Sequence, residues 1–201
     1  KRVDSLGARR RPSDVAPTST NHKFTDIDGY WAATYVDFLY STGITTGYED
    51  GTFRPNQNIT RAQFSAMLFR YLGLSESDSA SVQLPFADNS SIPSYAVPAV
   101  KALYSKGIIN GSTGADGKLY FNPNASLTRA QAATMIGRTQ EKGYATTALT
   151  FSDAASIPSY ATYYIQTMVA QGVISGYSDG TFLPNASITR GQMAKILYNL
   201  L

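Results

Sequence analysis

The sequence predicts a mostly α-helical fold in which three helix–loop–helix repeats surround a shared axis with pseudo-three-fold symmetry. Three segments align with one another and start at Phe24, Phe86 and Phe151. Each combines a helical apolar stripe, a loop rich in Gly, Asp and Pro, and a second apolar stripe. Self-similarity at a period of about 60 residues is typical of repeat architectures, whose units bury their apolar faces against each other.

The first helix of each repeat is predicted from its spacing and from a glycine stop. In repeat 1, Val36, Leu39 and Tyr40 lie at helical spacing. Gly43 followed by Ile44 is typical of a helix end with a hydrophobic contact beyond it. The next stretch, GYEDGTFRPN, places Asp-Gly and Pro-Asn steps around one aromatic residue and therefore predicts a turn-rich loop.

The second helix begins at a motif that occurs three times, as ITRAQ, LTRAQ and ITRGQ. In the first copy, Thr60 and Gln63 fit a capping box, which makes Arg61 the first helical residue. Apolar residues at helical spacing follow in repeat 1 (Phe64, Met67, Leu68, Tyr71, Leu72) and in repeat 3 (Met193, Ile196, Leu197, Leu200, Leu201). The stripe of repeat 2 is weaker, because Ala132, Met135 and Ile136 are followed by the polar residues Thr139 and Gln140. One helix pair cannot bury such a stripe alone, so the three stripes are expected to face one another.

We divide the chain into repeat 1 (residues 21–80), repeat 2 (81–145) and repeat 3 (146–201), which together form one composite domain. Residues 1–20 have no periodicity and are rich in Arg, Pro, Ser and Thr. They are interpreted as a linker or an appended tail.

Composition excludes several classes of function. Five basic and two acidic side chains in residues 1–20 account for the whole net charge of +3, so the repeats are balanced and no nucleic-acid partner is expected. The chain has no cysteine and one histidine, His22, which argues against thiolate metal sites and histidine-dependent catalysis. No apolar run approaches the roughly 18 residues needed to span a bilayer, so membrane insertion is not expected.

The arginines at the three helix starts, Arg61, Arg129 and Arg190, require an explanation because the helix dipole disfavours a cation there. One hypothesis is anion recognition, since a guanidinium beside free helix N–H groups can hold a carboxylate or phosphate. The alternative is structural: each Arg packs on the neighbouring repeat and pairs with a recurring acid, namely Asp26, Asp88 or Asp153. The spacing alone does not decide between them.

Aromatic residues and glycines also recur at equivalent positions. Trp31, Tyr95 and Tyr160 each lie 12 residues before a helix-stop glycine. The burial preferences of large apolar side chains favour a core position for them over a ligand platform, although their polar tips suit a half-exposed groove. Three glycines open the loops, and a tight turn with positive φ is the favoured interpretation of each (Gly47, Gly111, Gly176).

The acidic residues do not form a recognisable metal or catalytic site. The stretches DIDG and YEDGTF lack the Gly and the final Glu at the positions that an EF-hand loop needs, so no metal ion or other cofactor is expected. A glycoside hydrolase needs two differently tuned carboxylates at a single site. A threefold-repeated arrangement provides no such asymmetry, so an enzyme is disfavoured.

With the FxD start, the GYxDGTFxPN loop and the TRAQ-like tetrads in three copies, the chain from about Phe24 to Leu201 resembles the S-layer homology domain family. The resemblance implies a three-pronged module with grooves between adjacent repeats. It implies non-catalytic anchoring of an exported S-layer or surface protein to secondary cell wall polysaccharide in the bacterial envelope, often through a pyruvylated N-acetylmannosamine. The family's ligand-contacting arginine maps onto Arg61, Arg129 and Arg190.

The candidate ligand-binding residues are the three arginines, the three aromatic residues, the three loop glycines and the glutamines of the tetrads (Gln63, Gln131, Gln192). Repeat 2 departs from the pattern, with 18 residues from Gly111 to Arg129 against 14 in the other repeats. We therefore expect replacement of Arg61 or Arg190 to weaken binding more than replacement of Arg129. Stability should change little if these arginines are exposed. A protein–protein assembly module of a surface layer is the alternative function.

Overall fold

The computed structural model describes residues 22–140 and 145–201, so the interpretation of residues 1–20 concerns a segment outside the described residues. In the described part, the α-helices are α1 (Ala33–Ser41), α2 (Arg61–Tyr71), α3 (Val97–Ser105), α4 (Arg129–Gly137), α5 (Ser159–Ala170) and α6 (Arg190–Asn199). Short 3₁₀ helices are η2 (Glu76–Asp78), η3 (Asn89–Ser91), η4 (Ser94–Ala96) and η5 (Ala154–Ser156). The prediction of a mostly α fold is confirmed.

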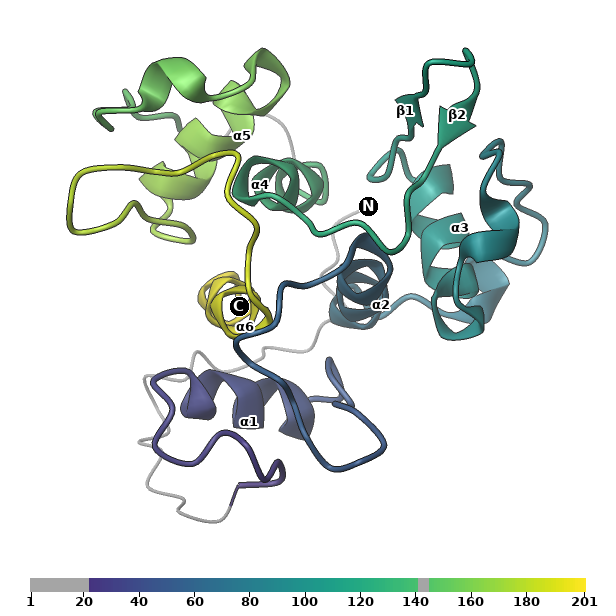
Figure 1. Cartoon of the computed structure of the whole chain (residues 1–201), viewed down its shortest axis with the longest axis horizontal. Coiled ribbons are helices and arrows are strands. Elements are labelled where there is room, and N and C mark those ends of the chain that lie inside the picture. Colours follow the sequence, from purple (N-terminus) through teal and green to yellow (C-terminus); the bar gives the residue numbers. More distant parts are fainter. Residues whose placement is uncertain (1–21, 141–144) are drawn as a thin grey trace.

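The inserted loop of repeat 2 forms a small hairpin that the sequence analysis did not predict. Strand β1 (Ser112–Thr113) pairs antiparallel with β2 (Leu119–Tyr120), and Ser112 lies opposite Tyr120. Asp116 closes the turn because its carboxylate accepts hydrogen bonds from the Lys118 backbone N–H and the Tyr120 hydroxyl. The hairpin projects from the outer edge of the molecule (Figure 1).

The second helix of each repeat lies near the middle of the molecule, and the first helices lie outside (Figure 1). All three central helices begin as predicted, with complete capping boxes at Thr60, Thr128 and Thr189. In each box the Thr hydroxyl accepts from the backbone N–H of the Gln, and the Gln side chain accepts from the backbone N–H of the Thr. These bonds satisfy two donors that a helix start otherwise leaves unpaired.

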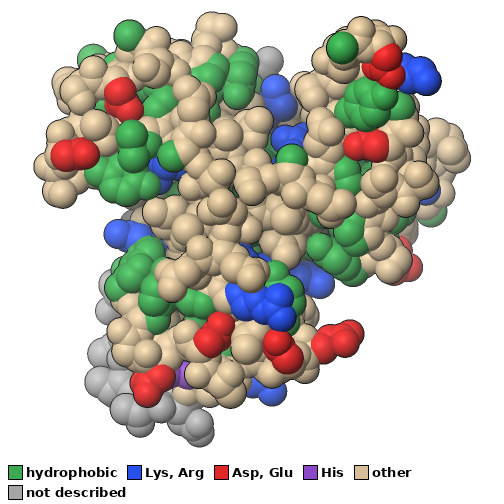
Figure 2. Space-filling model, in the orientation of Figure 1, with side chains coloured by type: hydrophobic (Ala, Val, Ile, Leu, Met, Phe, Trp, Pro, Cys, Tyr) green, Lys and Arg blue, Asp and Glu red, His purple; other side chains and the backbone are tan. Residues whose placement is uncertain are grey.

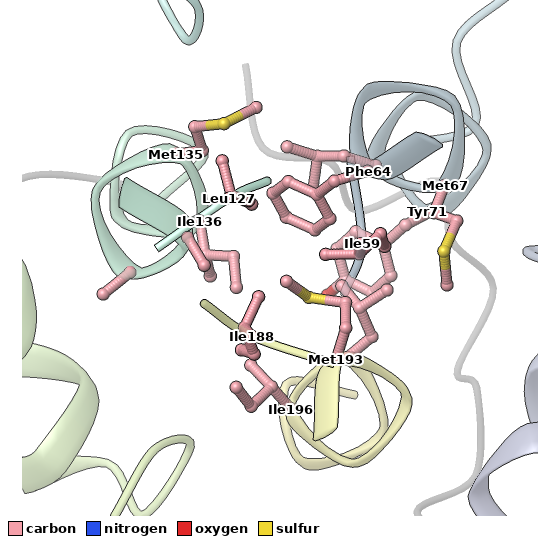
Figure 3. Packing of buried hydrophobic residues seen from close by; sticks show 14 of the residues in the cluster. Ile59, Phe64, Met67, Tyr71, Leu127, Met135, Ile136, Ile188, Met193 and Ile196 are labelled. Carbon is pink, nitrogen blue, oxygen red and sulfur yellow. The ribbon is translucent and has the colours of Figure 1, made fainter. Parts of the chain in front are cut away.

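Apolar side chains from the three central helices meet in a shared core (Figure 3). Phe64 of α2, Ile136 of α4 and Met193 of α6 are each almost fully buried. The predicted stripes of repeats 1 and 3 are buried through their central positions, whereas Leu72 and Leu200 are only partly covered. Helix α4, which carries the weaker stripe of repeat 2, has 9 residues against 11 in α2.

The outer helices pack against the central helix of a different repeat. Helix α3 of repeat 2 contacts α2 of repeat 1, α5 of repeat 3 contacts α4 of repeat 2, and α1 of repeat 1 contacts α6 of repeat 3. The first helix of repeats 2 and 3 therefore packs on the preceding repeat, and the first helix of repeat 1 packs on repeat 3.

A cycle of backbone hydrogen bonds joins the segments that enter the central helices. The Ile59 N–H donates to the Ile188 carbonyl at 2.9 Å, the Ile188 N–H to the Leu127 carbonyl at 2.9 Å, and the Leu127 N–H to the Ile59 carbonyl at 3.0 Å. All three side chains are fully buried. Since a buried N–H without a partner is costly, each repeat depends on both of its neighbours for a satisfied backbone.

Candidate ligand-binding grooves

The structure gathers the twelve candidate residues into three grooves, four to each. Groove A is lined by Arg190, Gly47, Gln63 and Tyr95. Groove B is lined by Arg61, Gly111, Gln131 and Tyr160. Groove C is lined by Arg129, Gly176, Gln192 and Trp31. Their volumes are about 580, 430 and 240 Å³, respectively. Figure 2 shows hollows between the lobes of the molecule, with Lys and Arg side chains in several of them.

Each groove combines residues from all three repeats. In groove B, Arg61 comes from repeat 1, Gly111 and Gln131 come from repeat 2, and Tyr160 comes from repeat 3. An arginine thus faces the loop of the next repeat, and Arg61, rather than Arg129, lies beside the inserted loop. The premise of the expected ranking, that an Arg and the loop of its own repeat share a groove, is therefore wrong.

The three arginines make the same contact with the neighbouring loop. In each, Nε donates a hydrogen bond of 2.7 Å to a Phe carbonyl: Arg61 to Phe121, Arg129 to Phe182 and Arg190 to Phe53. Each guanidinium also lies 4.5 to 5.0 Å from the centre of that Phe ring. The expectation that each Arg packs on the neighbouring repeat is confirmed by these contacts.

Burial of these arginines is greater than the sequence analysis assumed. Arg129 and Arg190 are each only 5% exposed, so the expectation of exposed side chains is wrong for both. Desolvation lowers the pKa of all three arginines from their ordinary value. Arg nevertheless stays charged at neutral pH because its ordinary pKa is so high.

No carboxylate in residues 22–140 and 145–201 pairs with these three guanidinium groups. Among the described residues, Arg54 forms an ion pair with Asp50, and Asp37 forms a hydrogen bond with His22. The predicted pairing with Asp26, Asp88 or Asp153 is therefore not a direct ion pair, although Asp88 attracts Arg61, Asp153 attracts Arg129 and Asp26 attracts Arg190 from beyond contact distance. Desolvation of each guanidinium outweighs this attraction, so its charge is only partly compensated. These grooves therefore hold cations that an anionic ligand could neutralise.

The recurring acids bind the loop backbone instead. The Asp153 carboxylate accepts the Phe182 and Leu183 N–H groups at 2.8 Å each. Leu183 has a φ of 55°, a left-handed conformation that disfavours a non-glycine residue. Asp26 and Asp88 hold the equivalent residues of the other loops in the same way. Each Asp thereby fixes the loop whose Phe carbonyl receives the Arg Nε.

The glutamines extend from the capping boxes towards the loops. Gln63 Nε2 donates to the Tyr48 hydroxyl at 2.8 Å, and Gln192 Nε2 lies 3.3 Å from the Tyr177 hydroxyl. Tyr48 and Tyr177 are also within 4.8 Å of the guanidinium groups of Arg190 and Arg129, measured to the ring centre. Repeat 2 has Ser112 at the equivalent position, so groove B lacks this tyrosine.

The three aromatic residues line the grooves with more than half of their surface exposed. Trp31, Tyr95 and Tyr160 are 54%, 54% and 51% exposed, so the favoured prediction of a core position is wrong. Trp31 precedes α1, Tyr95 lies in η4, and Tyr160 lies in the first turn of α5. Exposed rings at the edge of a groove can stack on a ligand.

The loop glycines are required by close packing. A Cβ atom at Gly47, Gly111 or Gly176 would lie 2.1 to 2.7 Å from the ring of the Phe that starts the same repeat. Only Gly47 also has the predicted positive φ, at 68°. The interpretation of Gly111 and Gly176 as positive-φ turn residues is therefore wrong, and steric exclusion of a side chain explains both.

Additional basic side chains, which the sequence analysis missed, line the same grooves. Arg70 lies in groove A, Arg138 in groove B and Lys195 in groove C. Arg70 and Arg138 are each nine residues after a tetrad arginine, and this shared spacing was the signal available in the sequence. Grooves B and C are lined by no acidic residue, so both are cationic.

Within the residues that the structure describes, no group of three or more His, Asp or Glu side chains could hold a metal ion. No helix in that part of the chain combines the length and apolar character needed to cross a bilayer. These findings concern residues 22–140 and 145–201.

Comparison with known families identifies the repeats. The S-layer homology domain matches residues 23–65, 85–133 and 150–194, one region in each repeat. The chain belongs to the S-layer homology domain family. Each matched region contains one tetrad and one loop glycine, so the regions that match the family include residues that line the grooves.

Similar proteins come from bacterial cell surfaces and from multidomain enzymes. An endoglucanase of Bacillus sp. (strain KSM-635) is 34% identical over 85% of this chain, and a cellulosome-anchoring protein of Acetivibrio thermocellus is 31% identical over 75%. The S-layer protein EA1 of Bacillus anthracis is 27% identical over 91% of the chain. The chain spans only 18%, 34% and 20% of these relatives, respectively. The family and the surface relatives support a cell-surface anchoring module at the bacterial cell wall or S-layer.

Proposed function

We propose that this chain is a non-catalytic module that anchors an S-layer or surface protein to secondary cell wall polysaccharide by binding a pyruvylated N-acetylmannosamine. The observation that carries this proposal is the presence in every groove of a largely buried arginine that forms no direct ion pair with a carboxylate of the described residues. Each such arginine lies near an exposed aromatic ring and a glycine backbone. We also propose that the three repeats are related by a pseudo-three-fold axis, which the cyclic backbone bonds support.

The groove offers a separate contact for each part of such a sugar. A pyruvate ketal carries a carboxylate, which the guanidinium can neutralise through N–H groups other than Nε–H. The exposed Trp or Tyr ring can stack on the apolar face of the pyranose. The loop glycine lets the sugar approach the backbone closely, because any side chain there would collide with Phe24, Phe86 or Phe151.

Preorganisation favours this binding mode over loose electrostatic attraction. Nε of each arginine is held by a Phe carbonyl, and that carbonyl belongs to a loop fixed by an Asp. The guanidinium is thus oriented before any ligand arrives, so less side-chain entropy is lost on binding. The same arrangement in the three grooves gives the module several equivalent contacts to one polymer, and multivalency raises the apparent affinity.

Calorimetric titration with pyruvylated and chemically depyruvylated wall polysaccharide tests the proposal. We expect removal of the pyruvate to weaken binding by about 1.5–3 kcal/mol, the usual contribution of a hydrogen bond to a charged group. Equal affinity for both polymers would contradict the mechanism. Sedimentation of the chain as a tight oligomer that ignores both polymers would support the assembly module instead.

A further inference from the structure

The three grooves differ at one equivalent position of their central helices. The sixth residue of each helix, counted from the tetrad arginine, is Ala66 in α2, Thr134 in α4 and Lys195 in α6. Ala66 lines groove A, Thr134 lines groove B and Lys195 lines groove C. This position therefore presents three side chains of increasing length to three otherwise similar sites.

Groove volume falls as this side chain grows, from about 580 Å³ with Ala66 to 430 Å³ with Thr134 and 240 Å³ with Lys195. The Thr134 hydroxyl donates a hydrogen bond to the Ala130 carbonyl of its own helix at 2.9 Å. Lys195 is exposed, and its Nζ lies 6.0 Å from the centre of the Trp31 ring. Attraction between the ammonium group and the indole ring holds the lysine on the side of groove C.

Other substitutions do not explain the narrowing equally well. The tenth position, counted from the tetrad arginine, is Arg70 beside groove A and Arg138 beside groove B, but Asn199 beside groove C. A shorter side chain at this position would widen groove C. The ring of Trp31 is larger than those of Tyr95 and Tyr160, so it narrows groove C as Lys195 does. Trp31 is also the residue that the Lys195 ammonium group contacts.

We propose that the residue at this position sets the length of glycan that each groove accepts. Groove A admits the anionic terminal sugar together with a second sugar unit, whereas Lys195 and Trp31 restrict groove C to the terminal sugar alone. Pockets for small organic ligands range from roughly 300 to 1,000 Å³, so groove C lies below that range and groove A well within it. The inference rests on the proposed function, because it takes the ligand to be an anionic glycan.

The test isolates one groove at a time in the full chain. Replacing Trp31 and Tyr160 with Ala leaves groove A intact, and replacing Tyr95 and Tyr160 with Ala leaves groove C intact. These rings are more than half exposed, so the fold should tolerate their removal. The probes are the pyruvylated N-acetylmannosamine methyl glycoside and the same sugar extended by one further sugar. We expect the extension to tighten binding about tenfold in groove A and less than about twofold in groove C.

Exchanging the residues should exchange the preferences. In the groove C background, Lys195→Ala should produce a preference for the extended probe of about tenfold, while Lys195→Met, which keeps most of the length but removes the charge, should not. Ala66→Lys should remove the preference from groove A, with circular dichroism used to check that the variant is folded. Lys106→Ala is the matched control, since it removes an exposed lysine outside the grooves.

Two results would overturn the inference while leaving the proposed function intact. One is an unchanged preference in Lys195→Ala. The other is a Lys195→Met variant that behaves like Lys195→Ala, because charge rather than side-chain length would then decide. Failure of the unmodified chain to bind either probe would overturn the proposed function and this inference together.

Discussion

Each groove arginine belongs both to the protein scaffold and to the candidate binding surface. The Nε–H of Arg190 donates a hydrogen bond to the Phe53 carbonyl, while Arg190 also lines groove A. The structural and ligand-binding hypotheses for these residues are therefore compatible, because different N–H groups of one side chain serve each purpose. The sequence could not distinguish them, since it does not indicate which repeat an arginine faces.

Replacement of Arg190 with Ala should affect folding as well as binding. The Phe53 carbonyl would lose its partner and a buried cavity would remain, so we expect the free energy of unfolding to fall by about 1–3 kcal/mol. Urea denaturation measures this change. Arg54→Ala is the control: Arg54 lies in the same groove but forms a largely exposed ion pair with Asp50, so its loss should change the free energy of unfolding much less. Equal effects of the two substitutions would show that burial of Arg190 is unimportant for stability.

Asp153 should make the fold sensitive to acid. Hydrogen bonds from the backbone N–H of Phe182 and then of Leu183 hold the pKa of Asp153 below its ordinary value of 3.8. The stability that this carboxylate contributes is present above the unfolded-state pKa and is lost as the pH falls from 3.8 towards the lowered value. Asp153→Asn should therefore reduce the dependence of the unfolding free energy on pH in that window.

Denaturation curves collected between neutral pH and pH 2 would measure this dependence. Glu49→Gln serves as the control, because Glu49 is a surface carboxylate in an equivalent loop of repeat 1. An Asp153→Asn variant with the same acid profile as the unmodified chain would contradict the role assigned to these hydrogen bonds.

Among the elements, the third central helix departs from the repeated motif for a steric reason. Gly191 replaces the alanine found at the second position of α2 and α4. A Cβ atom there would lie 2.8 Å from the Tyr30 hydroxyl and 2.9 Å from its ring, and 3.2 Å from the Pro55 carbonyl. The glycine is thus matched to a tyrosine of repeat 1, which reaches the start of α6.

Gly191→Ala should destabilise the fold by about 1–3 kcal/mol, the usual cost of overpacking a buried site. The same substitution in a Tyr30→Ala background should cost less, because the two closest contacts are gone and only the Pro55 carbonyl, at 3.2 Å, remains. Thermal or urea denaturation of the four chains in this double-mutant cycle gives the coupling directly. An additive result would show that Tyr30 does not explain the glycine.

In the whole molecule, closure of the repeats should make folding all-or-none. Deleting residues 146–201 would remove α5 and α6, so α4 and α1 would each lose the helix that packs against it. Ile59 and Leu127 would also lose their bonding partner Ile188, Ile59 as donor and Leu127 as acceptor. We expect the remaining chain to show no cooperative unfolding transition by circular dichroism. A sigmoidal transition close to that of the full chain would contradict this interdependence.

Local features of this structure were predictable from the sequence, and its long-range pairing was not. Capping at Thr60 and the helix stop at Gly43 depend on neighbouring residues, and both are confirmed. The exposure of Trp31 and the contact of Arg61 with repeat 2 depend on which repeats pack together. Three similar repeats do not indicate which helices pack together, because packing within a repeat and packing between repeats bury the same hydrophobic pattern.

Cyclic closure leaves the order of the repeats along the polypeptide largely interchangeable. His22 contacts Asp37 of α1, and α1 packs on α6, so both described ends of the chain belong to one packed unit. A circular permutant that joins residue 201 to residue 22 through a flexible linker and opens the chain between residues 80 and 81 would encode repeats in the order 2, 3, 1. Its three grooves should re-form with the same residues, because no groove relies on peptide-bond continuity between its contributing repeats.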